Sequence, residues 1–152
     1  MASAHEVARY IIRFFQEAGD PVTNLKLQKL LYYVQGWHLA LRGESAFPEN
    51  LEAWVHGPVQ SSIYGTYKHN RWSPINEEVA PATLSEALKE VIDSVLETYG
   101  GDTGFELELR THQEFPWLQA RGDLLPDAES RNVISVESMK RFFSSLRDGQ
   151  AQ

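Results

Sequence analysis

No cysteine occurs among the 152 residues, which excludes disulfide bonds, thiolate metal sites and cysteine nucleophiles. The chain also lacks an uninterrupted apolar run of the roughly 20 residues that span a bilayer. Its first residues show no basic stretch followed by an apolar core, as a signal peptide would. We therefore expect a cytoplasmic protein with no membrane partner.

Basic residues are also scarce, and charge is distributed unevenly along the chain. The net charge is −7; residues 1–75 carry seven Lys or Arg and six Asp or Glu, whereas residues 76–152 carry seven and fifteen. A chain without a basic stripe is poorly suited to a phosphate backbone, because binding there depends on Lys and Arg displacing counterions. We expect no nucleic-acid partner, and the acidic second half is better suited to a basic protein surface.

The sequence does contain the hydrophobic periodicity that is typical of helices. With 42% hydrophobic and 11% aromatic residues, it predicts a single domain over residues 1–152. The expected fold class is mainly α, a compact helical fold of about six helices with a small β element near residues 45–56. Helices are expected over residues 3–18, 24–41, 84–99, 103–110 and 135–146, with shorter ones opened by Gly57-Pro58 and Pro116-Trp117.

Local signals refine these helices. The spacing of a capping box occurs three times, at Ser3 with Glu6, Thr83 with Glu86, and Thr103 with Glu106. Gly36, inside the helix over 24–41, costs up to about 1 kcal/mol in helix propensity, which predicts a close packing contact there. Lys26 and Lys29 lie off the apolar stripe of the same helix and are expected to be solvated.

No catalytic, cofactor or metal motif is present, so we expect neither a cofactor nor a metal. His56 and His112 lie in tight, proline-bearing contexts, and His112 with Glu114 offers the residue types of an acid–base pair, as in a hydrolase. Neither a nucleophile nor a metal-ligand set accompanies them. Capping a helix or binding a buried carbonyl is therefore the favoured role, and we assign no catalytic residue.

Two groups of residues are candidates for contact with a protein partner. The first lies where the third helix runs into a polar loop, a kind of segment that often carries function. Its candidates are Tyr64, Tyr67, Lys68, His69 and Trp72. Aromatic residues at helical spacing are commonly core residues, and Tyr32 and Tyr33 on the second helix share this ambiguity.

The second candidate is an acidic face on the helix over 84–99. Its acidic residues recur three and four positions apart, so that like charges lie along one side at a cost of about a few tenths of a kcal/mol per pair. A solvated face explains this pattern most simply, whereas a basic partner would exploit it. The face comprises Glu86, Glu90, Asp93 and Glu97, of which Glu86, Glu90 and Glu97 are the candidates for partner binding.

Three blocks of sequence resemble a known family. They run from Asp20 to Ala40, from Phe47 through Trp54-Val55-His56-Gly57-Pro58-Val59, and from Thr111 to Trp117. In this order they resemble the Panacea domain of SocA-like and phage-associated GepA-like proteins, from about Ala4 to the last helix. We assign structural roles to the motif residues, which are Leu27, Lys29, Leu30, Tyr33, Gly36, Trp37, Trp54, His56, Gly57, Pro58, His112, Glu114, Pro116 and Trp117.

The resemblance implies an antitoxin of a bacterial or prophage type II toxin–antitoxin system. Such a protein neutralises a cognate toxin, encoded by the adjacent gene, through direct protein contact, and some SocA-like members deliver the toxin to a Clp protease. The family is mainly helical and implies no catalytic residue; we expect no separate DNA-binding domain. A phage-associated interaction protein without an antitoxin role, or a hydrolase using His112 and Glu114, remains the alternative.

Overall fold

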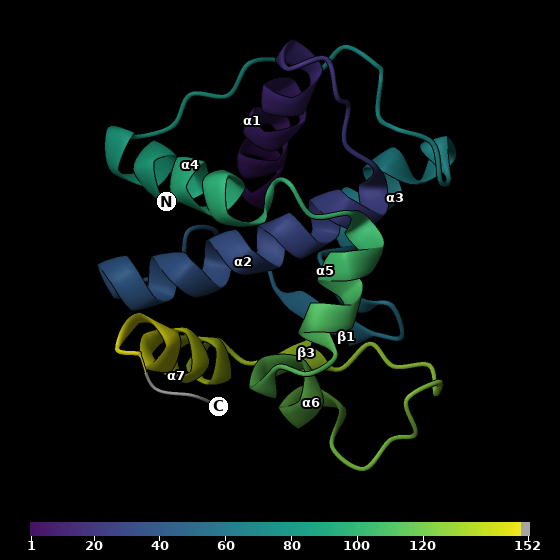
Figure 1. Cartoon of the computed structure of the whole chain (residues 1–152), viewed down its shortest axis with the longest axis vertical. Helices are drawn as coiled ribbons and strands as arrows, with labels where there is room; N and C mark the ends of the chain where they lie inside the picture. The colour runs from purple at the N-terminus through teal and green to yellow at the C-terminus, as the bar shows by residue number, and fades with distance from the viewer. Residues whose placement is uncertain (150–152) are drawn as a thin grey trace.

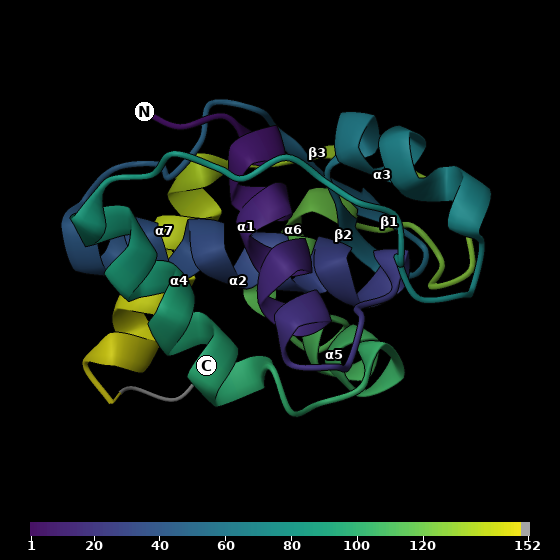
Figure 2. The ribbon, with the colours of Figure 1, turned by 90° about the horizontal axis from the view of Figure 1, so that it is seen from above.

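A long central helix, α2 (Asn24–Arg42), organises the molecule, as Figures 1 and 2 show. α1 (Ala4–Glu17) and α4 (Glu86–Tyr99) lie on one side of it, and α7 (Val136–Arg147) lies on the other (Figure 1). This computed structural model describes residues 1–149. One cluster of buried hydrophobic side chains connects the four helices, and the predicted mainly α fold is confirmed.

Shorter helices surround this core. They are α3 (Ser61–Tyr67), a single 3₁₀ turn η1 (Lys68–Asn70), α5 (Gly104–Thr111) and α6 (Phe115–Arg121). Residues 1–149 thus contain seven α-helices, close to the predicted number of about six, and the short helices α3 and α6 have seven residues each. None of the helices in this part of the chain is both long and apolar enough to cross a bilayer.

A three-stranded antiparallel sheet covers one end of α2. Its order is β2-β1-β3, with β1 (Leu51–Trp54) in the middle, β2 (Gly57–Val59) on one edge and β3 (Val133–Ile134) on the other. The predicted β element near residues 45–56 corresponds to β1. β3 was not expected, because a two-residue strand has no alternating pattern and exists only through its pairing with β1.

The prediction that Gly57-Pro58 opens the third helix is wrong. These residues form the edge strand β2, where proline is tolerated because its missing N–H faces away from the ladder. Gly57 has a φ of +104°, which excludes a helical start there. α3 begins at Ser61 instead, with the side chain of Gln60 accepting the N–H of Ile63 at 2.9 Å.

Two of the three predicted capping boxes are confirmed. Ser3 with Glu6 and Thr103 with Glu106 form reciprocal caps at the starts of α1 and α5. The third, at Thr83 with Glu86, is wrong, since Ser85 caps α4 and its hydroxyl accepts the N–H of Leu88. Thr83 and Ser85 are both good caps, so composition alone does not choose between them.

α2 is buried on nearly every side, and this overturns one prediction and confirms another. Lys29, expected to be solvated, is fully buried; Lys26 is half-buried and its Nζ donates to the carbonyl of Gly100 at 2.6 Å. Gly36 does make the predicted close contact, because a Cβ there would lie 2.1 Å from the ring of Phe143 on α7. The single apolar stripe seen in the sequence therefore understates how completely the helix is covered.

Buried polar side chains of α2 hold the surrounding loops in place. The side chain of Gln35 accepts the N–H of Ala46 at 2.7 Å and donates to the carbonyl of Phe47 at 2.9 Å. Gln28 accepts the N–H of Gln60 at 2.9 Å, which ties the start of α3 to the central helix. Since buried amides cost free energy unless they are hydrogen-bonded, these contacts fix the loop positions.

Candidate functional site

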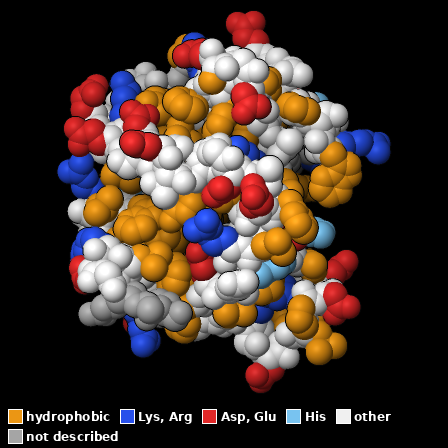
Figure 3. Space-filling model, in the orientation of Figure 1, with side chains coloured by type: hydrophobic (Ala, Val, Ile, Leu, Met, Phe, Trp, Pro, Cys, Tyr) orange, Lys and Arg blue, Asp and Glu red, His pale blue; other side chains and the backbone are white. Residues whose placement is uncertain are grey.

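A surface groove of about 730 Å³ lies between α2, the β1–β2 hairpin and the segment formed by α3 and η1. We call it the α3 groove. Its aromatic walls are Trp54, Tyr64 and Trp72, and the basic side chains of Lys68 and Arg71 lie at its rim. In Figure 3 hydrophobic and basic side chains gather at the right-hand edge of the molecule, over α3.

Trp72 is the most exposed aromatic side chain of the groove. Its side chain is 78% exposed, whereas Trp54 and Tyr64 are half-buried and pack edge to face with ring centroids 5.1 Å apart. An indole carries a large apolar area whose burial against a partner is favourable. An exposed tryptophan beside two partly exposed aromatic rings is typical of a protein-contact surface.

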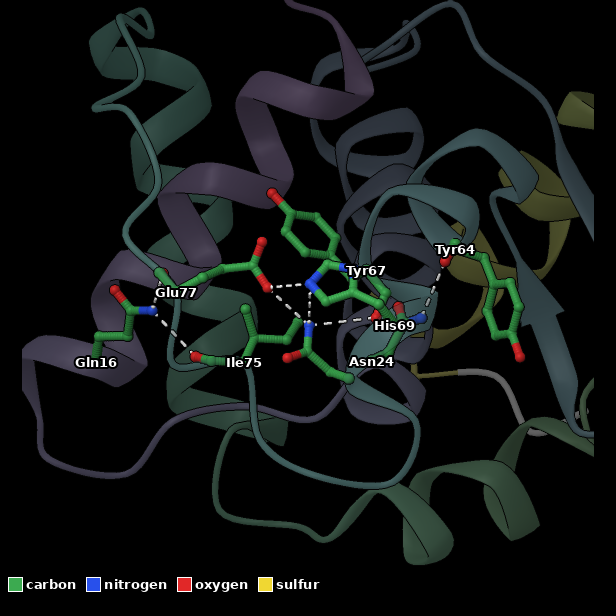
Figure 4. Close-up of polar contacts among 8 residues, drawn as sticks. Gln16, Asn24, Tyr64, Tyr67, His69, Ile75 and Glu77 are labelled. Carbon is green, nitrogen blue, oxygen red and sulfur yellow. Dashed lines mark hydrogen bonds and ion pairs between the residues drawn. The ribbon is translucent and has the colours of Figure 1, made fainter.

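The outer wall of the groove is braced by hydrogen bonds to the rest of the chain (Figure 4). Glu77 lies 2.7 Å from Nε2 of His69 and accepts from the side-chain amide of Asn70 at 2.8 Å; the Asn70 amide is the main factor that lowers the pKa of Glu77. Gln16 of α1 donates to the carbonyls of Ile75 and Glu77. These contacts fix the segment before any partner binds.

Arg71 has a strained backbone at the rim of the groove. With φ +55° and ψ −120°, it is the one non-glycine residue within 1–149 that has a positive φ. Gly122, at the end of α6, has nearly the same conformation, φ +57° and ψ −122°. Glycine adopts this conformation freely and arginine does not, so the chain keeps an arginine where glycine would be less strained.

Lys29 lies beneath the groove. Its Nζ donates to the carbonyl of Pro58 at 2.9 Å, and burial lowers its pKa to about 7 against the opposing effect of Glu108. The backbone of Gly57 passes so close that a Cβ there would lie 2.7 Å from the lysine Cε. The lysine stem therefore packs directly against the hairpin and supports the groove floor.

A second buried group connects α2 to the start of α6. The carboxyl of Glu114 accepts hydrogen bonds from the hydroxyls of Tyr32 at 2.9 Å and Tyr33 at 3.1 Å, and the ring of Tyr33 stacks on Tyr99 with centroids 4.0 Å apart. Burial raises the pKa of Glu114 to about 7, although the two tyrosine hydroxyls favour its ionised form. Tyr32 and Tyr33 are thus core residues, each 0% exposed.

His112 serves a different part of the structure. Its Nε2 lies 2.9 Å from the carbonyl of Val55, and its ring stacks on Trp117, whose indole N–H donates to the carbonyl of Trp54 at 2.8 Å. Glu114 is engaged by tyrosines, so the two residues of the proposed acid–base pair have separate partners. Within residues 1–149 no cluster of three acidic or histidine side chains is placed to hold a metal ion.

The remaining motif residues also have structural contacts, which are either polar contacts with other side chains or packing in the interior. Trp37 donates its indole N–H to the hydroxyl of Tyr99 at 2.9 Å, and Nδ1 of His56 lies 3.0 Å from Glu108 at the surface. The others are buried: Leu27, Leu30, Gly36, Gly57, Pro58 and Pro116.

The two predicted contact surfaces lie apart. α3 and α4 occupy opposite ends of the molecule in Figures 1 and 2, so Glu86, Glu90 and Glu97 do not join the groove. All three are exposed, but Glu90 pairs with Arg42 at 3.0 Å and Glu86 with Lys89 at 3.5 Å. Of the first group, Tyr64, Lys68, His69 and Trp72 line the groove together, whereas Tyr67 is buried with 4% exposure.

Comparison with known proteins identifies the family of this chain. The family model described as "Antitoxin SocA-like, Panacea domain" matches residues 27–118, which include α2 from Leu27 onward, the β1–β2 hairpin, the groove segment and α6 up to Leu118. The chain belongs to this family. It is 31% identical to Antitoxin SocA of Caulobacter vibrioides over 129 residues, covering 75% of this chain and 68% of that protein. No solved structure matches the chain.

Membership of the SocA-like antitoxin family supports an antitoxin role, and the resemblance noted in the sequence is confirmed. The Panacea motif residues mostly build the interior, while the groove rim also uses Arg71, which was not among the candidate site residues. Its positive φ has no sequence signal, because arginine rarely adopts it. Trp54, one of the motif residues to which a structural role was assigned, also forms part of the groove wall.

Replacement of Glu114 by glutamine is expected to change how stability depends on pH. In the wild type the folded state keeps the Glu114 proton up to about pH 7, whereas the unfolded state releases it near 4.5. The free energy of unfolding attributable to this group therefore falls as pH rises between these values, by about 3 kcal/mol in all. Urea unfolding from pH 4.5 to 7.5 measures this effect. The free energy of unfolding of Glu114→Gln minus that of wild type should increase with pH, and parallel profiles would contradict the prediction.

Proposed function

We propose that the protein is a single-domain antitoxin that neutralises a toxin, encoded by the adjacent gene, by binding it directly. Family membership and similarity to Antitoxin SocA support the antitoxin role. The observation that favours direct binding is the exposed Trp72 on a braced groove, in a chain that buries most of its other aromatic side chains.

Occlusion is the physical mechanism that fits this surface. The groove wall is fixed by Gln16, Asn24 and Glu77 before binding, so little conformational entropy is lost when a partner docks. A few well-packed aromatic and arginine side chains commonly supply most of the binding energy of an interface. By covering a functional surface of the toxin, the antitoxin would keep it inactive without any chemical step.

Co-expression tests the proposal. The adjacent reading frame is induced alone and together with this protein in a bacterial host, and growth and co-purification are measured. We expect the neighbour alone to arrest growth and the pair to restore it, with the two proteins eluting as one complex. A harmless neighbour, or rescue without a complex, would show that direct neutralisation is wrong.

Delivery of the bound toxin to a Clp protease is a further element that the resemblance to SocA-like proteins suggests. The same rescue, repeated in a host that lacks the protease, separates delivery from occlusion. If occlusion is sufficient, growth rescue and toxin half-life are the same in both hosts. A longer toxin half-life and weaker rescue in the deletion host would show that proteolysis contributes.

A further inference from the structure

The geometry of the α3 groove points to the chemistry of its occupant: an extended acidic segment of the toxin that carries an apolar anchor side chain. This inference rests on the proposed function, because it takes the toxin as the partner. It goes beyond that function by assigning the docking surface and the kind of sequence that the surface recognises.

Charge is the first argument. The whole chain has 21 acidic and 14 basic residues, yet no Asp or Glu among residues 1–149 lines the groove. The lining includes Lys29, Lys68 and Arg71 together with His56 and His69. Lys68 and Arg71 thus place positive charge at the rim of this concavity in an otherwise acidic protein, which favours an acidic ligand over a basic one.

The two rim cations are also available for a partner. His56 and His69 each face a carboxylate of this chain, Glu108 and Glu77 respectively. Lys68 and Arg71, by contrast, have no ion-pair partner among residues 1–149. Carboxylates of the toxin segment would form ion pairs with these two side chains, and the guanidinium of Arg71 can bind a carboxylate through two hydrogen bonds.

The aromatic walls of the groove indicate the second feature of the toxin segment, its apolar anchor side chain. Trp72 stands 78% exposed, while Trp54 and Tyr64 form an edge-to-face pair inside the groove. An apolar side chain placed among these rings would be removed from water. A groove of about 730 Å³ is large enough for several side chains of an extended segment.

Single-stranded nucleic acid is the other ligand that basic grooves with aromatic walls bind. The net charge of −7 argues against it, since the chain as a whole repels a polyanion. Two unpaired cations suit a short segment that mixes carboxylates with an apolar residue better than a continuous phosphate backbone. We therefore assign a protein segment to the groove.

Three variants of the full chain test the assignment in complex with the toxin. Lys68→Glu/Arg71→Glu reverses the rim charge, Trp72→Ala removes the anchor, and Glu86→Lys/Glu90→Lys/Glu97→Lys reverses the α4 face as a matched control. Binding is measured by calorimetry at several salt concentrations. We expect the rim variant to bind at least tenfold more weakly with a flatter salt dependence, and Trp72→Ala at least tenfold more weakly with an unchanged one. The α4 variant should bind within about twofold of wild type.

Arg71→Gly separates binding from folding. Because glycine relieves the positive φ at this position, the melting temperature should rise while toxin affinity falls. A variant that is more stable and binds more weakly cannot be explained by damage to the fold.

The outcomes separate the two proposals. Wild-type rescue with unchanged affinity of the rim variant would overturn the groove assignment and leave the antitoxin function standing. Strong loss for the α4 variant alone would move the interface to the acidic face. Binding of a labelled single-stranded 20-mer DNA to wild type, lost in Trp72→Ala, would replace the protein segment by nucleic acid. Failure of wild type itself to rescue would overturn the proposed function, and this inference with it.

Discussion

A chain carrying Gly36→Leu is expected not to reach its native fold. Gly36 lies where α2 crosses α7, and even a Cβ at this position would be 2.1 to 2.7 Å from three ring atoms of Phe143. Phe143 is fully buried and packs edge to face on Tyr32, Tyr33 and Trp37, so its ring has no free space to move into. Overpacking a close-packed core typically costs about 1–3 kcal/mol and occasionally more, and here α2 and α7 must separate.

The smaller change Gly36→Ala gives a measurable version of this prediction. Urea unfolding should show a loss of about 3 kcal/mol, at the upper end of that range. Gly65→Ala is the matched control, because nothing lies within 4 Å of a Cβ at that helical position; it should be neutral or stabilise by about 0.4–1 kcal/mol. Equal effects of the two substitutions would contradict the packing of α7 on α2.

Stability is expected to rise between about pH 7 and pH 9.5 because of Lys29. Burial lowers the pKa of this lysine to about 7 in the folded state, whereas the unfolded chain keeps the proton up to about 10.5. In that window the unfolded state binds more protons, so the free energy of unfolding increases with pH. The full difference corresponds to about 5 kcal/mol, of which about 3 kcal/mol falls below pH 9.5.

Lys29→Met keeps the length of the side chain and removes the titration. Its unfolding free energy should not show the rise above pH 7, so the difference between the variant and wild type changes steadily with pH. Glu114→Gln is the internal control, since it acts only between about pH 4.5 and 7. A wild-type profile above pH 7 that parallels that of Lys29→Met would show that the buried amine does not titrate in this range.

The sequence predicts local structure well where local interactions decide it. The helices α1 and α5 begin directly after their predicted caps, Ser3 and Thr103, because a capping box involves only residues three positions apart. The strand β3 and the burial of Lys29 were not predictable in this way. Both depend on partners far along the chain, Leu51 for Ile134 and Pro58 for Lys29.

The candidate site likewise has some features that the local sequence predicts and others that depend on the fold. Tyr64, Lys68, His69 and Trp72 were predicted as one surface, and the structure places them along one groove. The burial of Tyr67 follows from which side of α3 faces the core, and neighbouring aromatic residues in a short helix do not reveal that. The positive φ of Arg71 and the position of Trp54 in the groove wall could be found only from the fold.

The braces around the α3 groove also separate architecture from recognition. The side chains that hold the segment, Gln16, Asn24 and Glu77, differ from Lys68 and Trp72, which we propose contact the partner. Substitutions at Lys68 and Trp72 leave the bracing side chains and the core untouched, so we expect the partner specificity to change at almost no cost in stability. Such a fold is suited to a change of partner, because new side chains at the groove rim are sufficient and the core with its bracing hydrogen bonds stays the same.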